Sequence, residues 1–390
     1  DTITGGAGAD TVILGTHLSS LDTIDGGAGT DELRFTDSGS ATSDLDGVTN
    51  VETVTLGDAA TSVKTVDGLV GAGQTLTISA AALTGTNALT WDGSAETNGS
   101  FDITGSSQAD TITGGAGADT ITGGAGADTV ILGTHLSSLD TIDGGAGTDE
   151  LRFTDSGSAT SDLDGVTNVE TVTLGDAATS VKTVDGLVGA GQTLTISAAA
   201  LTGTNALTWD GSAETNGSFD ITGSSQADTI TGGGSDDIIK GGAGTDAVTA
   251  GSGDDTITGG AGADTVILGT HLSSLDTIDG GAGTDELRFT DSGSATSDLD
   301  GVTNVETVTL GDAATSVKTV DGLVGAGQTL TISAAALTGT NALTWDGSAE
   351  TNGSFDITGS SQADTITGGA GADTITGGAG ADTVILGTHL

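Results

Sequence analysis

The stretch GGAGADTITGGAGADTVI at 114–131 consists of two nonapeptides that follow one pattern, G-G-x-G-x-D-x-U-x, where U is a large aliphatic residue. The pattern recurs as GGAGTDAVT at 241–249 and GGAGADTVI at 259–267. Its first six residues are predicted to form a turn, because glycine tolerates positive φ and close backbone approach. Its last three are predicted to form a short strand with the aliphatic side chain inward. Two such half-turns close one rung of a flattened coil.

The nonapeptide turns occur throughout the chain. Complete G-G-x-G-x-D turns start at Gly5, Gly26, Gly114, Gly123, Gly144, Gly241, Gly259, Gly280, Gly368 and Gly377. Degenerate turns, in which one or more glycines are replaced, start at Gly105, Gly223, Gly232, Ala250 and Gly359. Tandem repetition at a fixed period is typical of solenoid proteins.

A longer repeat contains these runs. The stretch DTITGGAGADTVILGTHL at Asp1 recurs unchanged at Asp119, Asp255 and Asp373, which gives repeat units 1–118, 119–254, 255–372 and 373–390. The second unit has 18 extra residues after Thr231, or two nonapeptides. Since 18 residues would add one whole rung and leave later side chains facing the same way, this difference supports a rung of two nonapeptides. The chain begins and ends within repeats, so we interpret it as an excerpt of a longer protein.

Composition limits the core and the counter-charge. The 390 residues include 69 Gly, no Pro, no Cys, no Met, three Trp and six Phe, so a broad core cannot form. The formal charge of −47 would hold the chain open by self-repulsion, and would repel nucleic acid and anionic lipid. Without thiolates, the expected counter-charge is a hard cation that prefers oxygen ligands, and Ca²⁺ fits best. No apolar run is long enough for membrane insertion.

Between the nonapeptide runs, short apolar segments recur with longer spacing. In the first unit they are ELRF at 32–35, VETVTL at 51–56, VKTV at 63–66, TLTIS at 75–79, ALTW at 88–91 and FDIT at 101–104. Their alternating β-branched residues, separated by Gly, Asp, Ser and Asn, predict strands of wider rungs in one continuous solenoid. A separate β-sandwich over 35–104 is the competing interpretation. SAAAL at 79–83 is expected to form a short helical turn.

The nonapeptide resembles the repeat in toxin (RTX) signature of secreted bacterial calcium-binding proteins. This resemblance implies an all-β fold, a parallel β-solenoid or β-roll, with narrow calcium-binding rungs alternating with wider rungs. It implies that the sixth-position carboxylates, with backbone carbonyls of two stacked turns, share multiple Ca²⁺ ions. The implied metal ligands are Asp10, Asp31, Asp110, Asp119, Asp128, Asp149, Asp228, Asp237, Asp246, Asp255, Asp264, Asp285, Asp364, Asp373 and Asp382.

A shared site needs turns that lie one rung apart. The pairs expected to stack are Gly105 with Gly123, Gly223 with Gly241, Gly232 with Ala250, Gly241 with Gly259, and Gly359 with Gly377. The run 223–267 should hold the most ions. LGTHLSSLDTID at 14–25 is interpreted as three inserted residues plus a nonapeptide without turn glycines, which retains Asp22 and Ile24 but is expected to have lost its calcium.

Other chemistry-bearing residues have ordinary explanations. His17, His135, His271 and His389 are one residue in four copies, expected to be a solvated turn histidine rather than a metal ligand or pH sensor. Trp91, Trp209 and Trp345 are one residue in three copies, expected to pack at a wide rung, with carbohydrate stacking as the alternative. Short threonine ladders resemble those of ice-binding solenoids, but VIL segments interrupt them. No catalytic motif is present, so no enzymatic activity is expected.

These observations favour a calcium-dependent structural repeat protein of a surface layer, extracellular fibre or matrix. The RTX resemblance implies an extracellular or bacterial cell-surface location after type I secretion, with folding on calcium binding outside the cell. Recurrence of one surface predicts self-association into a fibre or lattice, and no nucleic-acid partner is expected. The alternatives are an adhesin stalk that binds a cell-surface glycan, and the calcium-binding tail of a secreted enzyme.

Overall fold

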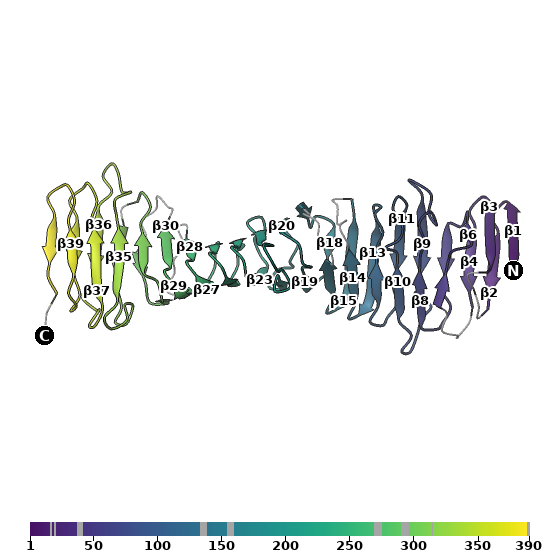
Figure 1. Cartoon of the computed structure of the whole chain (residues 1–390), viewed down its shortest axis with the longest axis horizontal. Helices are drawn as coiled ribbons and strands as arrows, with labels where there is room; N and C mark the ends of the chain where they lie inside the picture. The colour runs from purple at the N-terminus through teal and green to yellow at the C-terminus, as the bar shows by residue number, and fades with distance from the viewer. Residues whose placement is uncertain are drawn as a thin grey trace. The chain divides into compact units, whose positions relative to one another are not determined.

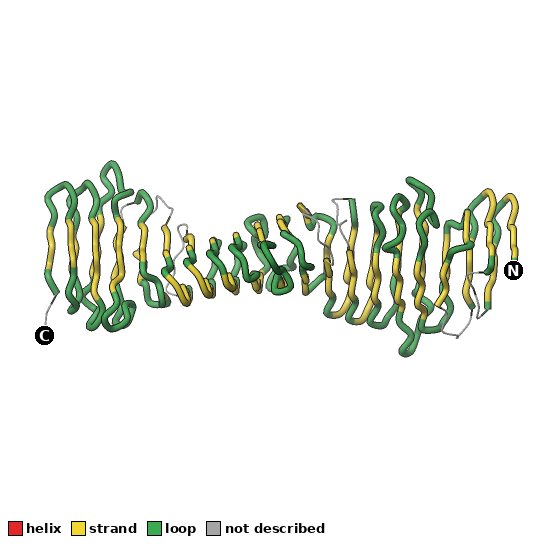
Figure 2. Tube along the Cα trace, viewed as in Figure 1, coloured by secondary structure: helices red, strands yellow, loops and turns green. Residues whose placement is uncertain are grey.

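The computed structural model describes residues 1–15, 18, 21–36, 42–132, 139–153, 160–268, 275–289, 296–313 and 315–387. Every regular element in these ranges is a β-strand, and Figure 2 shows strands and loops with no helix among the described residues. Among the same residues, no helix has the length and hydropathy needed to cross a membrane.

The strands are short and follow one another along the whole chain. Those of the first half are β1 (Thr2–Ala7), β2 (Thr11–Leu14), β3 (Thr23–Ala28), β4 (Glu32–Phe35), β5 (Thr42–Asp44), β6 (Val48–Thr49), β7 (Thr53–Thr55), β8 (Thr61–Lys64), β9 (Thr75–Ser79), β10 (Leu89–Asp92), β11 (Ser100–Thr104), β12 (Thr111–Thr113), β13 (Thr120–Gly126), β14 (Thr129–Leu132), β15 (Thr141–Gly147), β16 (Glu150–Phe153), β17 (Thr160–Asp162), β18 (Val166–Thr167), β19 (Thr171–Thr173) and β20 (Thr179–Lys182).

The second half continues the arrangement and includes the additional rung after Thr231. Its strands are β21 (Thr193–Ser197), β22 (Leu207–Asp210), β23 (Ser218–Thr222), β24 (Thr229–Thr231), β25 (Ile238–Ala243), β26 (Ala247–Thr249), β27 (Thr256–Gly262), β28 (Thr265–Leu268), β29 (Thr277–Gly283), β30 (Glu286–Phe289), β31 (Thr296–Asp298), β32 (Val302–Thr303), β33 (Thr307–Thr309), β34 (Thr315–Lys318), β35 (Thr329–Ser333), β36 (Leu343–Asp346), β37 (Ser354–Thr358), β38 (Thr365–Thr367), β39 (Thr374–Thr376) and β40 (Thr383–Ile385).

Contacts divide the chain into two compact units, 1–189 with 194–197, and 190–193 with 198–390. Within the first unit, an eight-stranded sheet runs in the order β18-β15-β13-β11-β9-β7-β4-β2. Within the second, a five-stranded sheet runs β31-β34-β36-β38-β40. Every described pairing is parallel and joins strands from successive rungs, and Figure 1 shows these strands side by side in each unit. The chain is therefore a parallel β-solenoid, as the repeats predict.

The register confirms the predicted length of the narrow rung. Ile112 pairs with Val130 in the first unit, and Ile239 pairs with Ile257 in the second, each 18 residues on. Ile3 instead pairs with Ile24, which agrees with a nonapeptide pair lengthened by three inserted residues. Each additional 18 residues therefore places the next aliphatic side chain over the previous one.

The segments between the runs form wider rungs of the same coil. Thr53 pairs in parallel with Thr77, and Leu76 pairs in parallel with Phe101, so the strands from 32 to 104 continue the stack. The β-sandwich interpretation of 35–104 is wrong, because these strands pair with strands of the nonapeptide rungs instead of forming two antiparallel sheets. The expected helical turn at 79–83 is also wrong: Ser79 ends β9, and a turn closed by the Leu83 N–H and the Ala80 carbonyl follows, 3.0 Å.

A thin column of aliphatic and aromatic side chains fills the coil. The inward aliphatic of the nonapeptide is fully buried, as at Ile112 and Ile239. The wider rungs need larger side chains, and there Trp91 is 0% exposed and meets the Phe101 ring edge to face, with centroids 5.6 Å apart. Trp209 and Trp345 pack in the same way in their own copies. The hypothesis of carbohydrate stacking on these tryptophans is wrong, because no ring face is exposed.

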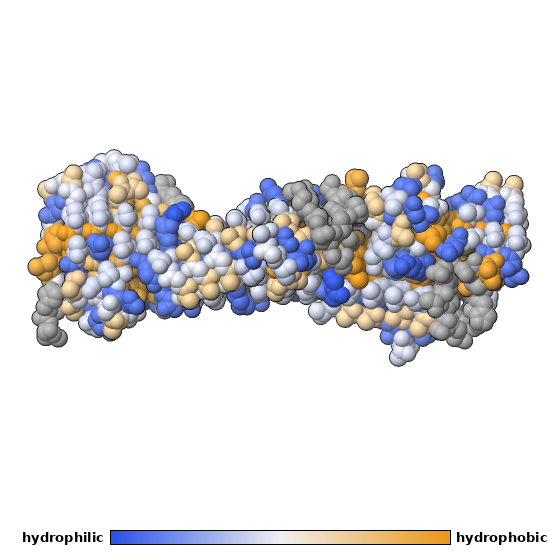
Figure 3. Space-filling view, in the orientation of Figure 1, coloured by the Kyte–Doolittle hydropathy of each residue, from blue (hydrophilic) through white to orange (hydrophobic). Residues whose placement is uncertain are grey.

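One buried glutamate in each repeat holds two long loops of the wide rungs. Glu96 is 1% exposed, and its Oε2 accepts the Val70 N–H at 3.0 Å while its Oε1 accepts the Gly99 N–H at 3.1 Å. Backbone donors compensate the cost of removing this carboxylate from water. Its copies Glu214 and Glu350 are buried likewise. Outside, pale and hydrophilic atoms cover much of the face shown in Figure 3, and apolar areas are separate from one another.

The register makes a deletion test possible. Removing residues 232–249 takes out one whole rung. We therefore expect the shortened chain to fold in calcium, with each remaining rung as stable as before. Removing only 232–240 exchanges the two edges for every later strand, because each nonapeptide supplies one edge. Hydrogen exchange measured with calcium present should show protection over 275–387 in the first variant and its loss in the second. Equal protection in both variants would exclude a two-nonapeptide rung.

Candidate metal centre

The sixth-position aspartates stack into columns along the edges of the coil. In the first unit, Asp128 Oδ1 accepts the Asp110 N–H at 2.7 Å, and Asp149 Oδ1 accepts the Asp128 N–H at 2.7 Å. In the second, Asp246 Oδ1 accepts the Asp228 N–H, and the column continues through Asp264 to Asp285. Each carboxylate therefore bridges to the backbone of the rung before it.

The predicted pairs of turns are confirmed as neighbours in these columns. At the five predicted pairs, a Cβ placed on the first residue of one turn would collide with the backbone carbonyl of the first residue of the other. These contacts join Gly105 to Gly123, Gly223 to Gly241, Gly232 to Ala250, Gly241 to Gly259, and Gly359 to Gly377. The run 223–267 stacks more turns than the other runs.

Most of the predicted ligand carboxylates are buried. The exposed fraction is 1–3% at Asp31, Asp110, Asp119, Asp128, Asp149, Asp228, Asp237, Asp246, Asp255, Asp264, Asp285 and Asp364. Asp10, Asp373 and Asp382 are half-buried. Rows of buried carboxylates repel one another and are costly to desolvate, so they require protons or cations nearby.

The turns have two conformations. In the first, which we call open turns, the second and fourth positions are glycines with positive φ, such as Gly242 at 115° and Gly244 at 131°. Open turns end in Asp10, Asp31, Asp128, Asp149, Asp246, Asp255, Asp264, Asp285 and Asp382. In seven of them the second carboxylate oxygen is buried and has no hydrogen-bond partner, at Asp10, Asp31, Asp128, Asp149, Asp246, Asp264 and Asp285.

In the second conformation, the closed turn, the carboxylate is already satisfied. Asp119 Oδ2 accepts the N–H of Gly115 in its own turn at 2.8 Å, while Oδ1 accepts the Phe101 N–H at 2.8 Å. Closed turns start at Gly105, Gly114, Gly223, Gly232, Gly359 and Gly368. Each closed turn is the first turn on its edge of the coil after a wide rung. The hydrogen bonds show this, since the N–H that donates to Oδ1 of each of these aspartates belongs to a leucine or phenylalanine of that wide rung.

For the hexapeptide GGAGAD, the rung before the turn selects the conformation, because the turn sequence is the same in both forms. GGAGAD at 114–119 forms a closed turn, and the same hexapeptide at 123–128 forms an open one. The closed turn lies against a wide rung, where the Ala116 N–H donates to the Glu96 carbonyl at 3.0 Å. The open turn lies on another turn. The same hexapeptide is therefore closed where the rung before it is wide and open where the rung before it supplies another turn.

Open turns present an oxygen-lined cradle that fits calcium. A Cβ at Gly241 would collide with the Gly259 carbonyl and lie 2.6 Å from Asp246 Oδ2, so only hydrogen leaves this space free. Among the described residues, no three His, Asp or Glu side chains form a cluster that could hold a metal. The carboxylates come instead in stacked pairs beside backbone carbonyls, an all-oxygen set that suits a hard, flexible cation. Calcium bound there supplies positive charge to oxygens that have no donor.

Burial shifts the acidity of these carboxyl groups. It raises the pKa of Asp119, Asp128 and Asp255 to about 6, and that of Asp237 and Asp246 to about 7. Desolvation is the main cause, and neighbouring aspartates in the column raise these pKa values further. Without a cation, the raised pKa values therefore mean that the ionised form of these carboxyl groups is destabilised near neutral pH.

The aspartate of the nonapeptide without turn glycines keeps its place in the column. Asp140, the copy of Asp22 in the second unit of the repeat, is 3% exposed, and its Oδ1 accepts the Asp119 N–H at 2.8 Å. The strand with Ile24 also persists, since Ile24 is 1% exposed in β3. Loss of calcium from this turn stays a prediction. All four histidines, His17, His135, His271 and His389, lie outside the described residues.

Sequence reasoning missed two sets of glutamates that belong to this architecture. Glu96 and its copies fasten the wide loops, as described above. Glu52 is the last member of an aspartate column, because its Oε2 accepts the Asp31 N–H at 2.8 Å. The signal for it is positional: Glu52 lies 21 residues after Asp31, the same separation as Asp31 from Asp10.

Comparison with known families agrees with this geometry. The family model described as "RTX calcium-binding nonapeptide repeat (4 copies)" matches residues 1–16, 21–35, 102–134, 139–153, 220–248, 241–270, 275–289 and 356–388. The matched segments are the nonapeptide runs and the strands beside them, and the wide-rung loops lie outside them. No curated protein matches the chain.

Asp246 tests the role of the open turns. In Asp246→Asn, the amide oxygen can still accept the Asp228 N–H, but the negative charge is lost. We expect the affinity of the site for calcium to fall by roughly tenfold or more, as measured by isothermal titration. Asp356→Asn, which removes an exposed carboxylate from β37, is the matched control and should leave calcium binding unchanged. Equal binding curves for the two variants would refute the assignment.

The raised pKa values predict how the calcium-free chain responds to pH. A carboxyl group whose pKa rises on folding binds more protons when folded, so stability falls as pH rises from the ordinary value, 3.8, to about 7. In calcium-free buffer, acidification from pH 7.5 to 4.5 should therefore increase β-structure and thermal stability. Circular dichroism melts at stepped pH measure this. A calcium-free chain that gains stability as pH rises over this window would contradict the burial of the columns.

Proposed function

Because the chain belongs to the family of RTX calcium-binding nonapeptide repeat proteins, we propose that it is a structural protein of the cell exterior and not an enzyme. In this proposal it leaves the cell unfolded by type I secretion and folds when it meets extracellular calcium. It then forms part of a surface layer, fibre or matrix.

Charge supports the link between secretion and folding. The chain has 54 acidic and seven basic residues, so at low calcium its repulsion favours an unfolded, export-competent state. Millimolar calcium outside the cell neutralises the aspartate columns, and because the sites exist only in the folded coil, the binding free energy becomes folding free energy.

The observation that carries the structural role is the recurrence of one surface. Arg34, Arg152 and Arg288 are copies of one residue, each 44–46% exposed and paired with the glutamate two residues before it. Three of the seven basic residues thus occur at equivalent places on an otherwise acidic chain. Cations at the same place in successive repeats that can meet the acidic surface of another copy suit lateral assembly into a lattice or bundle.

Electron microscopy and sedimentation of the calcium-loaded full chain test this proposal. We expect sheets or filaments with a regular repeat, and their loss in the Arg34→Gln, Arg152→Gln, Arg288→Gln triple variant. The matched control is Lys64→Gln, Lys182→Gln, Lys318→Gln, which removes the same charge from other positions and should still assemble. A folded chain that stays monomeric at all concentrations would reject the structural role.

A further inference from the structure

The geometry points to a second kind of calcium site, in which Glu52, Glu170 and Glu306 each close the last open turn of a nonapeptide run. No family match covers these glutamates, and their segments do not follow the nonapeptide pattern. The inference rests on calcium binding by the open turns and is independent of the structural role proposed above.

The segment that contains each glutamate replaces a whole turn in the stack. In the second compact unit, Val302 of β32 pairs with Ile278, before the turn Gly280–Asp285, and Thr307 pairs with Glu286, after it. The next rung therefore continues on both sides of this turn. Between these pairings, three residues, 304–306, stand opposite the six residues of the turn. A Cβ at Gly280 would collide with the Asn304 carbonyl, as one at Gly259 would with the Gly280 carbonyl. Asn304 therefore provides the same oxygen as a turn glycine.

The glutamate takes the place of the next aspartate. Glu306 Oε2 accepts the Asp285 N–H at 2.8 Å, and Asp285 Oδ1 accepts the Asp264 N–H at the same distance. The two copies repeat the contact: Glu52 with the Asp31 N–H at 2.8 Å, and Glu170 with the Asp149 N–H at 2.7 Å. Since the segment is three residues shorter than a turn, the additional methylene of glutamate lets its carboxylate reach the column.

The aspartate of this pair has one oxygen without a partner in every copy. Asp31, Asp149 and Asp285 are each 2% exposed, and the Oδ2 atom of each is buried without a hydrogen-bond partner. A Cβ at Gly26 would lie 2.9 Å from Asp31 Oδ2 and collide with the Asn50 carbonyl, so this oxygen and the substitute carbonyl border the same space. A glutamate that merely ended the ladder would leave this buried charged oxygen unsatisfied, whereas a cation satisfies it.

The asparagine backbone is held in an unusual conformation to present its carbonyl. Asn50, Asn168 and Asn304 have φ of 53°, 52° and 51°, and are the non-glycine residues with positive φ in the described chain. The Asn304 side-chain amide fixes this conformation by donating to Asp279 Oδ1 at 2.7 Å. Backbone strain of this kind persists where the surrounding structure requires it, and here it aligns the carbonyl with the column.

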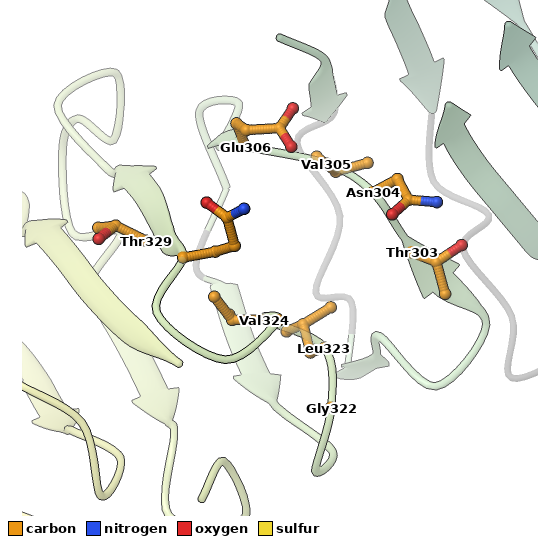
Figure 4. A pocket seen from close by; sticks show the side chains of 10 residues that line it. Thr303, Asn304, Val305, Glu306, Gly322, Leu323, Val324 and Thr329 are labelled. Atoms are coloured by element: carbon orange, nitrogen blue, oxygen red, sulfur yellow. The ribbon is translucent and has the colours of Figure 1, made fainter. Parts of the chain in front are cut away.

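The shortened segment also opens the site to solvent. Asn304 and Glu306 line a pocket of about 430 Å³ together with Leu323 and Val324, and Figure 4 shows these side chains around its walls. The equivalent residues of the first copy, Asn50 and Glu52, line a pocket of about 230 Å³. Calcium accepts water among its ligands, so the pocket gives an ion held by one aspartate and one glutamate room for further oxygens.

Counting bound calcium tests the assignment. In the triple variant Glu52→Gln, Glu170→Gln, Glu306→Gln, the amide oxygen can still accept the aspartate N–H, but the charge is lost. We expect three fewer calcium ions per chain, measured by atomic emission after gel filtration of the full chain in saturating calcium. The matched control is Glu32→Gln, Glu150→Gln, Glu286→Gln, which neutralises glutamates outside the columns and should keep the full count.

An unchanged number of bound calcium ions in the Glu52, Glu170 and Glu306 triple variant would overturn the inference. These glutamates would then only accept the last hydrogen bond of each aspartate column. If the triple variant does not fold, Glu306→Gln alone decides the question, because the other two copies remain intact. Loss of one ion supports the site, and no loss refutes it. Failure of the arginine variants to alter assembly has no bearing on this count, so the two proposals fail separately.

Discussion

The fold depends on stacked aspartate carboxylates that are buried at the edges of a coil too thin to have a large core. Each carboxylate accepts a backbone N–H of the rung before it. The donor is an aspartate where turns are stacked, and a leucine or phenylalanine where that rung is wide. The same arrangement places like charges one above another out of water, a state that is unfavourable without protons or cations. A cation that binds between the stacked carboxylates relieves this repulsion, so calcium binding would favour the folded state.

A turn's neighbour determines what its carboxylate can do. Where the rung before the turn is wide, the aspartate turns its second oxygen to an N–H of its own loop, and the turn is closed. Where the rung before it supplies another turn, the glycines take positive φ, the second oxygen has no donor, and a cradle appears. The number of open turns thus follows from how many turns are stacked in succession, and the run 223–267 stacks the most. At the end of each run a glutamate continues the column.

Much of this architecture can be predicted from the sequence, because the nonapeptide period fixes both the rung and the direction of each side chain. The strands at 32–35 and 75–79, the 18-residue register and the stacked pairs of turns all follow from counting. The two turn conformations cannot be predicted in this way, since one hexapeptide at 114–119 and 123–128 adopts both. Glu52 and Glu96 also escape prediction, because their contacts depend on register and loop packing that no local motif encodes.

Calcium-dependent folding is tested most directly by the far-ultraviolet circular dichroism of the full chain at neutral pH. The spectrum is measured in millimolar calcium, again after excess chelator, and once more after calcium is restored. We expect a β-sheet spectrum with calcium, its replacement by that of an unfolded chain on chelation, and its return with calcium. A β-sheet spectrum that is unchanged by excess chelator would contradict this expectation.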